Sequence, residues 1–304
     1  MSAADIAAAL GDARCEGRGW RCRCPLHGGR SLVLRDGDAG RVLVTCWTGC
    51  DRLDVLAELR RRGLLDGRAS YAPRIGAEPR RNDDALRIAW ALKIWGEARD
   101  GADCIARRYL ASRSIVLDRW PASLRFHARC PRPRDDTGNL LPPLPAMVAF
   151  VEHVQRGSVA VHCTYLRPDG SSKADIERPK AIFGRVGGGA VRFGKPRTGL
   201  WLAVGEGIET TLSVAVACSI PAWAALSAGG IRSLVLPPEA THVTICADYD
   251  ASGTGQRAAR DAAARWLAEG RRVRVAIPPR PNSDFNDVLT GRVAAKINEA
   301  RHVA

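Results

Sequence analysis

The apolar positions in the last third of the chain follow two alternating patterns. Short continuous apolar runs are typical of buried strands, and apolar residues spaced three or four apart are typical of helices with one buried face. Strands that alternate with helices usually form a parallel sheet with right-handed crossovers. We therefore predict an α/β domain over residues 200–304. Its strands are expected over 200–204, 222–226, 241–247 and 272–277, and its helices over 208–218, 254–269 and 285–301.

The first 64 residues have a different pattern, in which short alternating segments replace the continuous apolar runs. Residues 31–34 and 41–45 alternate apolar and polar side chains as the strands of a hairpin do, and a turn rich in Gly and Asp joins them. Helical spacing is present before the hairpin, over 3–10, and after it, over 51–63. The pattern predicts a small β domain with two helices.

The middle of the chain begins with a polar segment and continues with mixed elements. Residues 65–82 are polar and contain two prolines, as exposed linkers do. Helical spacing then gives way to strand-like alternation from about residue 146. We predict helices over 83–98 and 103–112, a loop-rich stretch over 121–145, and paired strands over 147–151 and 158–166.

Composition adds a strong positive charge to this picture. The 304 residues include 46 Lys and Arg against 32 Asp and Glu, which gives a formal net charge of +14. A basic surface favours a polyanionic partner, and the planar guanidinium of arginine binds two phosphate oxygens at once. The charge therefore favours nucleic-acid binding over the alternative that a GC-rich genome raised the arginine content.

The sequence gives no indication of a membrane span or a secretory signal. No apolar run approaches the roughly 20 residues that cross a bilayer. Residues Met1–Leu10 lack a basic stretch followed by an apolar core. We therefore expect a cytoplasmic protein without a membrane partner. In that compartment, cysteines are more often metal ligands or buried apolar residues than disulfides.

Five of the ten cysteines fall in the first 50 residues. Two residues separate Cys24 from His27, and three separate Cys46 from Cys50, on either side of the predicted hairpin. Three thiolates and one imidazole complete a tetrahedral shell, which is typical of structural zinc. A domain of about 60 residues has a small core, so a bound metal would contribute to its stability. Cys22 remains an alternative to Cys24 as the ligand.

Carboxylates follow three of the strands predicted in the C-terminal domain. Glu206 comes after the first strand, Asp248 and Asp250 come after the third, and Asp284 comes after the last. The carboxyl ends of parallel strands meet at one edge of the sheet, where such folds bind ligands. Like charges gathered there repel one another unless a cation holds them, and oxygen ligands suit Mg²⁺. We therefore expect these four residues to bind Mg²⁺ or Mn²⁺. The alternative for Asp248 and Asp250 is a solvated turn or a helix N-cap.

A basic, glycine-rich segment precedes this domain. Eight Lys and Arg residues fall between residues 167 and 197. We predict that this surface binds nucleic acid or a nucleoside triphosphate, and the alternative is a solvated charged face. A P-loop is excluded, because Pro196 occupies the place of the Ser or Thr that binds Mg²⁺ in that motif. The residues assigned to nucleic-acid or nucleotide binding are Lys180, Arg185, Arg192 and Lys195.

The spacing of Cys24, His27, Cys46 and Cys50 resembles the CHC2-type zinc-binding domain of bacterial-type DNA primases. In that family, a zinc-ribbon-like module helps to hold the single-stranded template. Cellular primases usually have two residues between the last two cysteines, and the longer spacing here resembles primase-like proteins of phages and integrated mobile elements. The resemblance implies a structural Zn²⁺.

The acidic residues resemble the signatures of the Toprim fold, which bacterial primases share with topoisomerases and certain nucleases. Glu206 lies in the first motif, Asp248 and Asp250 form the second, and Asp284 lies in a segment similar to the acidic motif that closes the primase version. The resemblance covers about residues 200–290. It implies that Glu206, Asp248 and Asp250 are catalytic. The further acidic residues of these motifs are Glu209 and Asp287.

The resemblance implies an α/β fold with a Toprim-type parallel-sheet catalytic domain. A small zinc-ribbon-like β domain and a helical connector would precede it. The predicted parts are a zinc-binding domain (1–64), a linker (65–82), a helical connector (83–145), a basic α+β subdomain (146–199) and a Toprim domain (200–304).

The activity that the resemblance implies is that of a DNA primase-like nucleotidyltransferase, which is a DNA-directed RNA polymerase. It would make short primers on single-stranded DNA from nucleoside triphosphates with Mg²⁺ or Mn²⁺. A separate replicative helicase is a further implied partner. Two alternatives stay open. One is a Toprim nuclease that uses the same carboxylates, and the other is a non-catalytic DNA-binding accessory of replication or defence.

Overall fold

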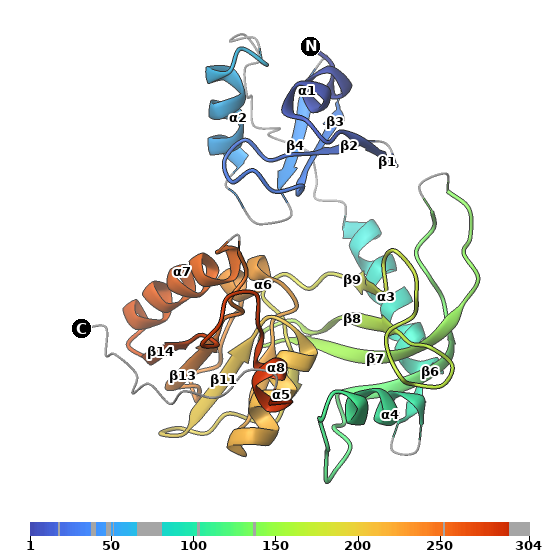
Figure 1. Ribbon diagram of the computed structural model, residues 1–304, viewed down its shortest axis with the longest axis vertical. Helices are drawn as coiled ribbons and strands as arrows, with labels where there is room; N and C mark the ends of the chain where they lie inside the picture. The colour runs from blue at the N-terminus through green and yellow to red at the C-terminus, as the bar shows by residue number, and fades with distance from the viewer. Residues whose placement is uncertain are drawn as a thin grey trace. The chain divides into compact units, whose positions relative to one another are not determined.

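The computed structural model forms two compact units (Figure 1). One comprises Met1–Pro79 with Arg134–Leu141, and the other comprises Arg80–Pro133 with Pro142–Ala304. Within the described ranges, no helix is long and apolar enough to cross a membrane. Most of the linker predicted over 65–82 lies outside these ranges, as does the end of the helix predicted over 285–301. The structure describes residues 1–17, 19–37, 41–46, 50, 52–65, 81–101, 104–135, 138–251 and 253–291.

The first unit contains a four-stranded antiparallel sheet in the order β1-β2-β3-β4. Its elements are α1 (Ala3–Leu10), β1 (Arg14–Glu16), β2 (Gly19–Cys22), β3 (Leu32–Asp36), β4 (Val42–Cys46) and α2 (Arg52–Arg61). A capping box between Ser2 and Asp5 starts α1, and the buried Ile6 packs against Leu32 and Leu34 of β3. The predicted antiparallel hairpin is confirmed as β3 and β4.

The second unit begins with a five-stranded antiparallel sheet in the order β5-β6-β7-β8-β9. Its elements are α3 (Arg81–Glu97), β5 (Arg99–Asp100), α4 (Ile105–Ser112), β6 (Leu124–Cys130), β7 (Leu144–His153), β8 (Gly157–Tyr165) and β9 (Lys180–Gly184). Helix α3 packs on one face, where Ile94 meets Val148. Helix α4 packs on the other face, where Tyr109 and Leu110 belong to the same core as Met147.

Strand β6 corrects one expectation, because it lies in the stretch over 121–145 that we expected to be loop. A bulge between His127 and Cys130 interrupts its alternation of buried and exposed side chains, and prolines flank it on both sides. Strands β5 and β6 come from the predicted helical connector and pair with strands of the predicted basic subdomain. That connector therefore contributes strands as well as helices, and the domain boundaries themselves stay a prediction.

The second sheet of this unit has the order β10-β12-β11-β13-β14, in which β10 is antiparallel and the other four strands are parallel. Its elements are β10 (Val191–Phe193), β11 (Trp201–Gly205), α5 (Ile208–Cys218), β12 (Ala222–Ala224), α6 (Ala228–Ser233), β13 (His242–Cys246), α7 (Thr254–Ala268), β14 (Arg272–Ala276) and α8 (Phe285–Leu289). The predicted α/β fold with a parallel sheet is confirmed.

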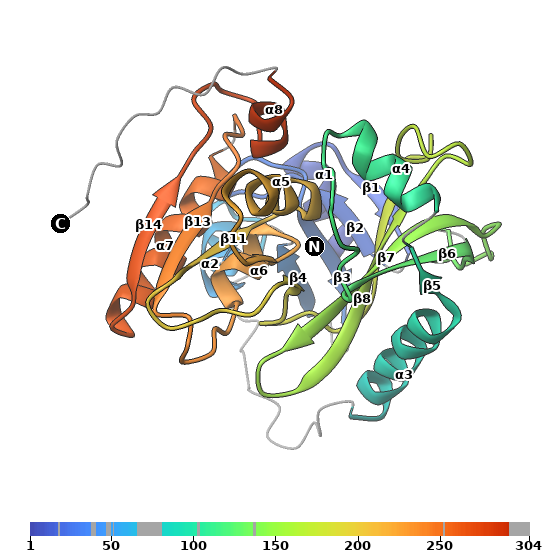
Figure 2. The same ribbon diagram turned by 90° about the horizontal axis from the view of Figure 1, so that it is seen from below.

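Helices cover both faces of this sheet, which explains its continuous apolar strands. Helices α5 and α8 lie on one face and α6 and α7 on the other (Figures 1 and 2). Ala203 packs towards Val214 of α5, whereas the neighbouring Leu202 packs in the core that contains Trp266 of α7. The short helix α6 was not predicted, because its six residues include two glycines and give little helical periodicity.

Candidate active site and metal centre

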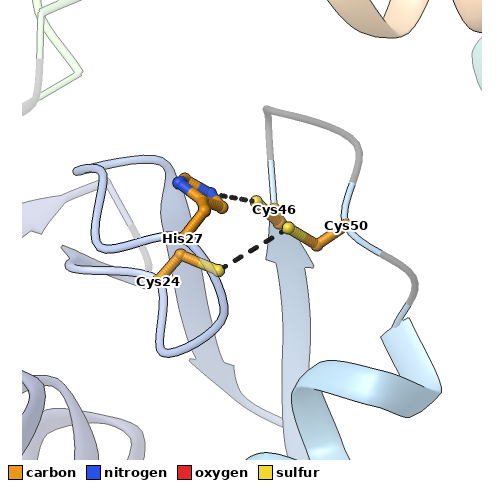
Figure 3. Close-up of side chains that lie close together, drawn as sticks. All are labelled: Cys24, His27, Cys46 and Cys50. Atoms are coloured by element: carbon orange, nitrogen blue, oxygen red, sulfur yellow. Dashed lines mark hydrogen bonds between the residues drawn. The ribbon is translucent and has the colours of Figure 1, made fainter. Parts of the chain in front are cut away.

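Four side chains of the first unit converge as a candidate metal centre (Figure 3). Cys24 and His27 lie on the turn after β2, Cys46 ends β4, and Cys50 precedes α2. Because β2, β3 and β4 are neighbours in the sheet, these segments meet. One ligand atom from each residue lies within 4.8 Å of the others. Three cysteines and one histidine are a donor set that structural zinc prefers.

Cys22, the alternative ligand, lies outside the set of four residues whose ligand atoms converge. Its side chain is fully buried and lies in the same cluster as Ile6 and Leu32. Cys24 is the cysteine of this pair whose sulfur faces Cys50, at an Sγ–Sγ distance of 3.8 Å.

Within the candidate zinc centre, hydrogen bonds stabilise the thiolate form of Cys46. The Sγ of Cys46 lies 3.3 Å from His27 Nε2 and 3.3 Å from the hydroxyl of Ser31. Hydrogen bonding from Cys24, with support from Ser31 and His27, lowers the pKa of Cys46 to about 3. The same hydrogen bond and burial raise the pKa of Cys24. A cation would remove the penalty on the second thiolate. Ser31 has no spacing signal in the sequence that would have singled it out.

The predicted acidic residues converge at the carboxyl ends of neighbouring strands of the second unit. Glu206 follows β11, and Asp248 and Asp250 follow the adjacent parallel strand β13. The Oε2 of Glu206 and the Oδ2 of Asp250 both face Gly255 of α7, at 3.7 and 3.4 Å from the position that a Cβ on this glycine would take. The first turn of α7 therefore closes against the two carboxylates.

Burial and mutual repulsion perturb the carboxyl groups of this site. Burial, followed by the charges of Glu206 and Asp284, raises the pKa of Asp248 to about 7. Its Oδ1 is buried without a hydrogen-bond partner among the described residues. Burial and the charge of Asp250 also raise the pKa of Glu206. An orphaned carboxylate oxygen among like charges is an environment that a divalent cation would relieve, so these residues fit Mg²⁺ or Mn²⁺.

Two of the carboxylates also stabilise helix N-termini. The carboxylate of Asp250 accepts hydrogen bonds from the backbone N–H groups of Thr254 and Gly255, each at 3.1 Å. Asp284 caps α8 and forms a capping box with Asp287. The N-cap residue of α7 is Gly253, so the N-cap that we gave as an alternative for Asp250 is not formed, and Asp250 binds the first N–H groups of the helix from three residues before that position.

The acidic group is more open than the cysteine–histidine group. Among the described residues, only the cysteine–histidine set has ligand atoms that all lie within 4.8 Å of one another. One oxygen of Asp284 already accepts hydrogen bonds from two backbone N–H groups. A cation at this site would therefore keep part of its shell for water or phosphate, as Mg²⁺ usually does.

The four predicted basic residues lie in different surroundings. Lys180 is the one that bears on the acidic site, because its charge opposes the rise in the pKa of Glu206. Arg185 forms an ion pair with Asp84 of α3. The Arg192 guanidinium lies 4.5 Å from the ring centroid of Trp223, and Arg192 and Lys195 line a separate cavity of about 1030 Å³. The binding role of these four residues stays a prediction.

Two groups that the sequence did not single out contact the acidic residues. The backbone N–H of Ala228, at the start of α6, hydrogen bonds to Glu206. The side chain of Thr210 hydrogen bonds to Asp248. Since α6 has no clear sequence pattern, Ala228 could not have been found. Thr210 could have been found, because it lies on the helix that starts after Glu206.

Two protein-family models match segments of the chain. Residues 201–295 match the family model of the Toprim domain. The chain carries a Toprim domain. The Toprim match contains all four residues of the predicted acidic site. Residues 85–193 match the model of a domain of unknown function, DUF7146. No curated protein matches the chain.

Solved structures similar to the chain include three of primase domains. The zinc-binding and RNA polymerase domains of the Aquifex aeolicus primase share 15% identity, over 96% of this chain and 80% of that one, with a TM-score of 0.44. A DnaG primase catalytic domain bound to ssDNA shares 13%, over 70% and 79%, with a TM-score of 0.43. A Pseudomonas aeruginosa DNA primase domain shares 19%, over 55% and 53%, with a TM-score of 0.35. The chain thus spans about half of the Pseudomonas chain.

We expect the purified chain to bind one Zn²⁺ and the Cys46→Ser variant to lose it, because the shell would keep only three of its four donors. Loss of the ion should lower the melting temperature of the first unit. Plasma mass spectrometry and scanning calorimetry measure the two effects. Cys15→Ser is the control, since Cys15 is exposed and lies outside the set. A Cys46→Ser protein that retained a full equivalent of zinc would contradict the assignment.

We also expect Asp248 to lower the stability of the metal-free protein at neutral and higher pH. Because the folded chain raises the pKa of Asp248 from 3.8 to about 7, it binds the proton more tightly than the unfolded chain does. The resulting stability is present at low pH and is lost as the pH rises through this range. Asp248→Asn should remove that dependence and stabilise the metal-free protein by about 1–3 kcal/mol near pH 8.

Urea unfolding of the metal-free protein at several pH values measures this effect. Asp261→Asn is the matched control, because Asp261 is an exposed carboxylate paired with Arg232. If Asp248→Asn destabilised the metal-free protein at every pH, the repulsion inferred at the acidic site would be absent.

Proposed function

We propose that the chain is a primase-like nucleotidyltransferase that joins nucleoside triphosphates on a single-stranded DNA template. The observation that carries the proposal is the convergence of Glu206 and Asp250 with Asp248, whose buried Oδ1 has no hydrogen-bond partner among the described residues, at the carboxyl end of the Toprim sheet. The candidate zinc centre and the net charge of +14 support a nucleic-acid partner. A separate helicase is a partner that we retain in the proposal.

Glu206, Asp248 and Asp250 would hold Mg²⁺ or Mn²⁺, with Asp284 beside them. A bound ion of this kind supplies positive charge to phosphate oxygens and lowers the pKa of an attacking hydroxyl. The residues themselves set the conditions for binding. Asp248 releases its proton when a cation takes its place, and the N–H groups at the start of α7 keep Asp250 oriented. Glu206 is held by the Ala228 N–H, so its Oε2 stays directed at Asp250 and Gly255.

Primer synthesis by the full chain tests the proposal. Given single-stranded DNA, nucleoside triphosphates and Mg²⁺, the protein should make short oligonucleotides, and Asp248→Ala should remove them because the cation loses a ligand. Denaturing gels resolve the products. Asp261→Ala, on the exposed side of α7, is the control and should leave the yield unchanged.

Other outcomes of this assay would contradict the proposal in distinct ways. Cleavage of DNA without nucleoside triphosphates, lost in Asp248→Ala, would identify a Toprim nuclease. Salt-sensitive DNA binding without turnover, unchanged in Glu206→Gln, would identify a non-catalytic DNA-binding protein.

A further inference from the structure

A buried ion cluster lies three residues beyond Glu206, on the first turn of α5. Its centre is Glu209, whose side chain is 6% exposed. Tyr109 donates a hydrogen bond to Oε1 of Glu209 at 2.6 Å, and the Nζ of Lys173 lies 2.9 Å from the same oxygen. The Nζ of Lys180 lies 3.6 Å from Oε2. Although burial opposes ionisation, the charges of Lys180 and Lys173 and the bond from Tyr109 hold the pKa of Glu209 well below its usual range.

The cluster ties the Toprim domain to the antiparallel sheet of the same unit. Tyr109 lies on α4, Lys173 follows β8, and Lys180 begins β9, whereas Glu209 belongs to α5. Both oxygens of Glu209 are already engaged by these partners. Two ammonium groups therefore balance the charge of Glu209, whereas the carboxylate of Asp250 accepts hydrogen bonds from uncharged backbone N–H groups. Glu209 acts on its surroundings through the ammonium groups of Lys173 and Lys180.

Contact with Glu209 does not use all the hydrogen-bond donors of the two lysines. An ammonium group has three donors, and each lysine contacts one oxygen of the carboxylate. The side chain of Lys173 is 29% exposed and that of Lys180 is 41% exposed, so solvent or a ligand can reach both. Lys180 affects a second carboxylate as well, because its charge opposes the rise in the pKa of Glu206. The positive charge of Lys180 therefore acts on both Glu209 and the acidic site.

Two polar atoms on the strand that pairs with Lys180 are unsatisfied. The Nδ1 of His162 and the Oγ1 of Thr164 are buried without hydrogen-bond partners among the described residues. Both lie on β8, where Thr164 is the pairing partner of Lys180. Burial and then the charge of Lys180 lower the pKa of His162 to about 4, so the imidazole is neutral near pH 7. Buried polar atoms are normally satisfied, and a polar ligand or its water would complete these.

We propose that Glu209 is a positioning residue that holds Lys173 and Lys180 to receive the phosphate oxygens of a nucleoside triphosphate. The inference rests on the proposed function for the identity of the nucleotide. Long lysine side chains lose considerable rotamer freedom when they are ordered, and two neighbouring ammonium groups repel each other. The buried carboxylate offsets both costs before the ligand arrives. Tyr109 also holds the carboxylate in place by its hydrogen bond to Oε1.

The first test is the affinity of the full chain for ATP with Mg²⁺, measured by calorimetry without a DNA template. Glu209→Gln keeps the shape of the side chain and removes its charge, and it should weaken ATP binding by about 10-fold or more. Tyr109→Phe should weaken it by about 2- to 5-fold, because only one hydrogen bond is lost. Glu209→Asp should recover part of the affinity. Glu269→Gln is the matched control, since Glu269 also contacts two cations, Arg265 and Arg271, but on the surface.

A double-mutant cycle separates positioning from a general loss of structure. If Glu209 acts through Lys180, then Glu209→Gln should have little further effect on ATP affinity in a Lys180→Met background. In primer synthesis, Glu209→Gln should raise the KM for nucleotide more than it lowers kcat. Fully additive effects, or ATP affinity equal to that of the unmodified chain, would overturn the inference. Should Glu209→Gln fail to fold, Tyr109→Phe with an unchanged affinity would overturn it equally.

The pH dependence of ATP binding gives a further readout. Burial lowers the pKa of Lys173, and Glu209 of α5 opposes this. The other groups that face Lys173 are Lys180 of β9, Arg113 and Tyr109 from the α4 side, and His162 of β8. Removal of the carboxylate should lower the pKa of Lys173 further, so ATP binding by Glu209→Gln should decline at a lower pH than in the unmodified chain. An alkaline limb at the same pH in both proteins would contradict the proposed role.

The outcomes distinguish this inference from the proposed function. ATP binding that depends on Glu209, in a chain that makes no primer, would support the positioning role and refute primer synthesis. Primer synthesis with the same KM in Glu209→Gln would support the proposed function and refute the positioning role. No ATP binding by the unmodified chain would refute the positioning role outright.

Discussion

Repulsion among carboxylates at the ends of β11 and β13 is the constraint on which the second unit depends. Parallel pairing of these strands forces Glu206, Asp248 and Asp250 to the same edge of the sheet. The fold compensates this repulsion only in part. The start of α7 supplies two N–H groups to Asp250, and the Ala228 N–H hydrogen bonds to Glu206. Burial and the neighbouring charges raise the pKa of Asp248 to about 7, which favours its protonated form. A divalent cation bound at this edge would relieve the repulsion that remains.

The two candidate metal centres differ in how closely their ligand atoms are gathered. The cysteine–histidine set is compact, and a metal bound there would stabilise a small β unit whose core alone is modest. The acidic set is open on one side, and part of its oxygen atoms are engaged in helix caps. Glu209 adds a third arrangement, in which a buried carboxylate is paired with two cations. The acidic edge and the ordered cations together make a surface that suits a metal-bound polyphosphate.

Much of this could be predicted from the sequence, because local patterns determined it. Helix α5 was predicted with its observed bounds, since residues 208–218 lie between two short apolar runs that predict strands. The convergence of the acidic residues followed from strand ends alone. Strand β6 was not predicted, because a bulge interrupts its alternation of buried and exposed side chains. Glu209 was given no role, because its partners come from positions 109, 173 and 180, which only the tertiary fold brings together. Arg192 was expected near the nucleotide, and its stacking on Trp223 depends on the antiparallel pairing of β10 with β12, which has no local signal.

The central claim is that Glu206, Asp248 and Asp250 share one divalent cation, and anomalous diffraction from crystals soaked in Mn²⁺ tests it most directly. The account predicts an anomalous peak within coordination distance of all three carboxylates, about 2.0–2.6 Å, and no such peak in crystals of Asp248→Asn. A peak in both crystals, or none at this edge of the Toprim sheet, would contradict the claim.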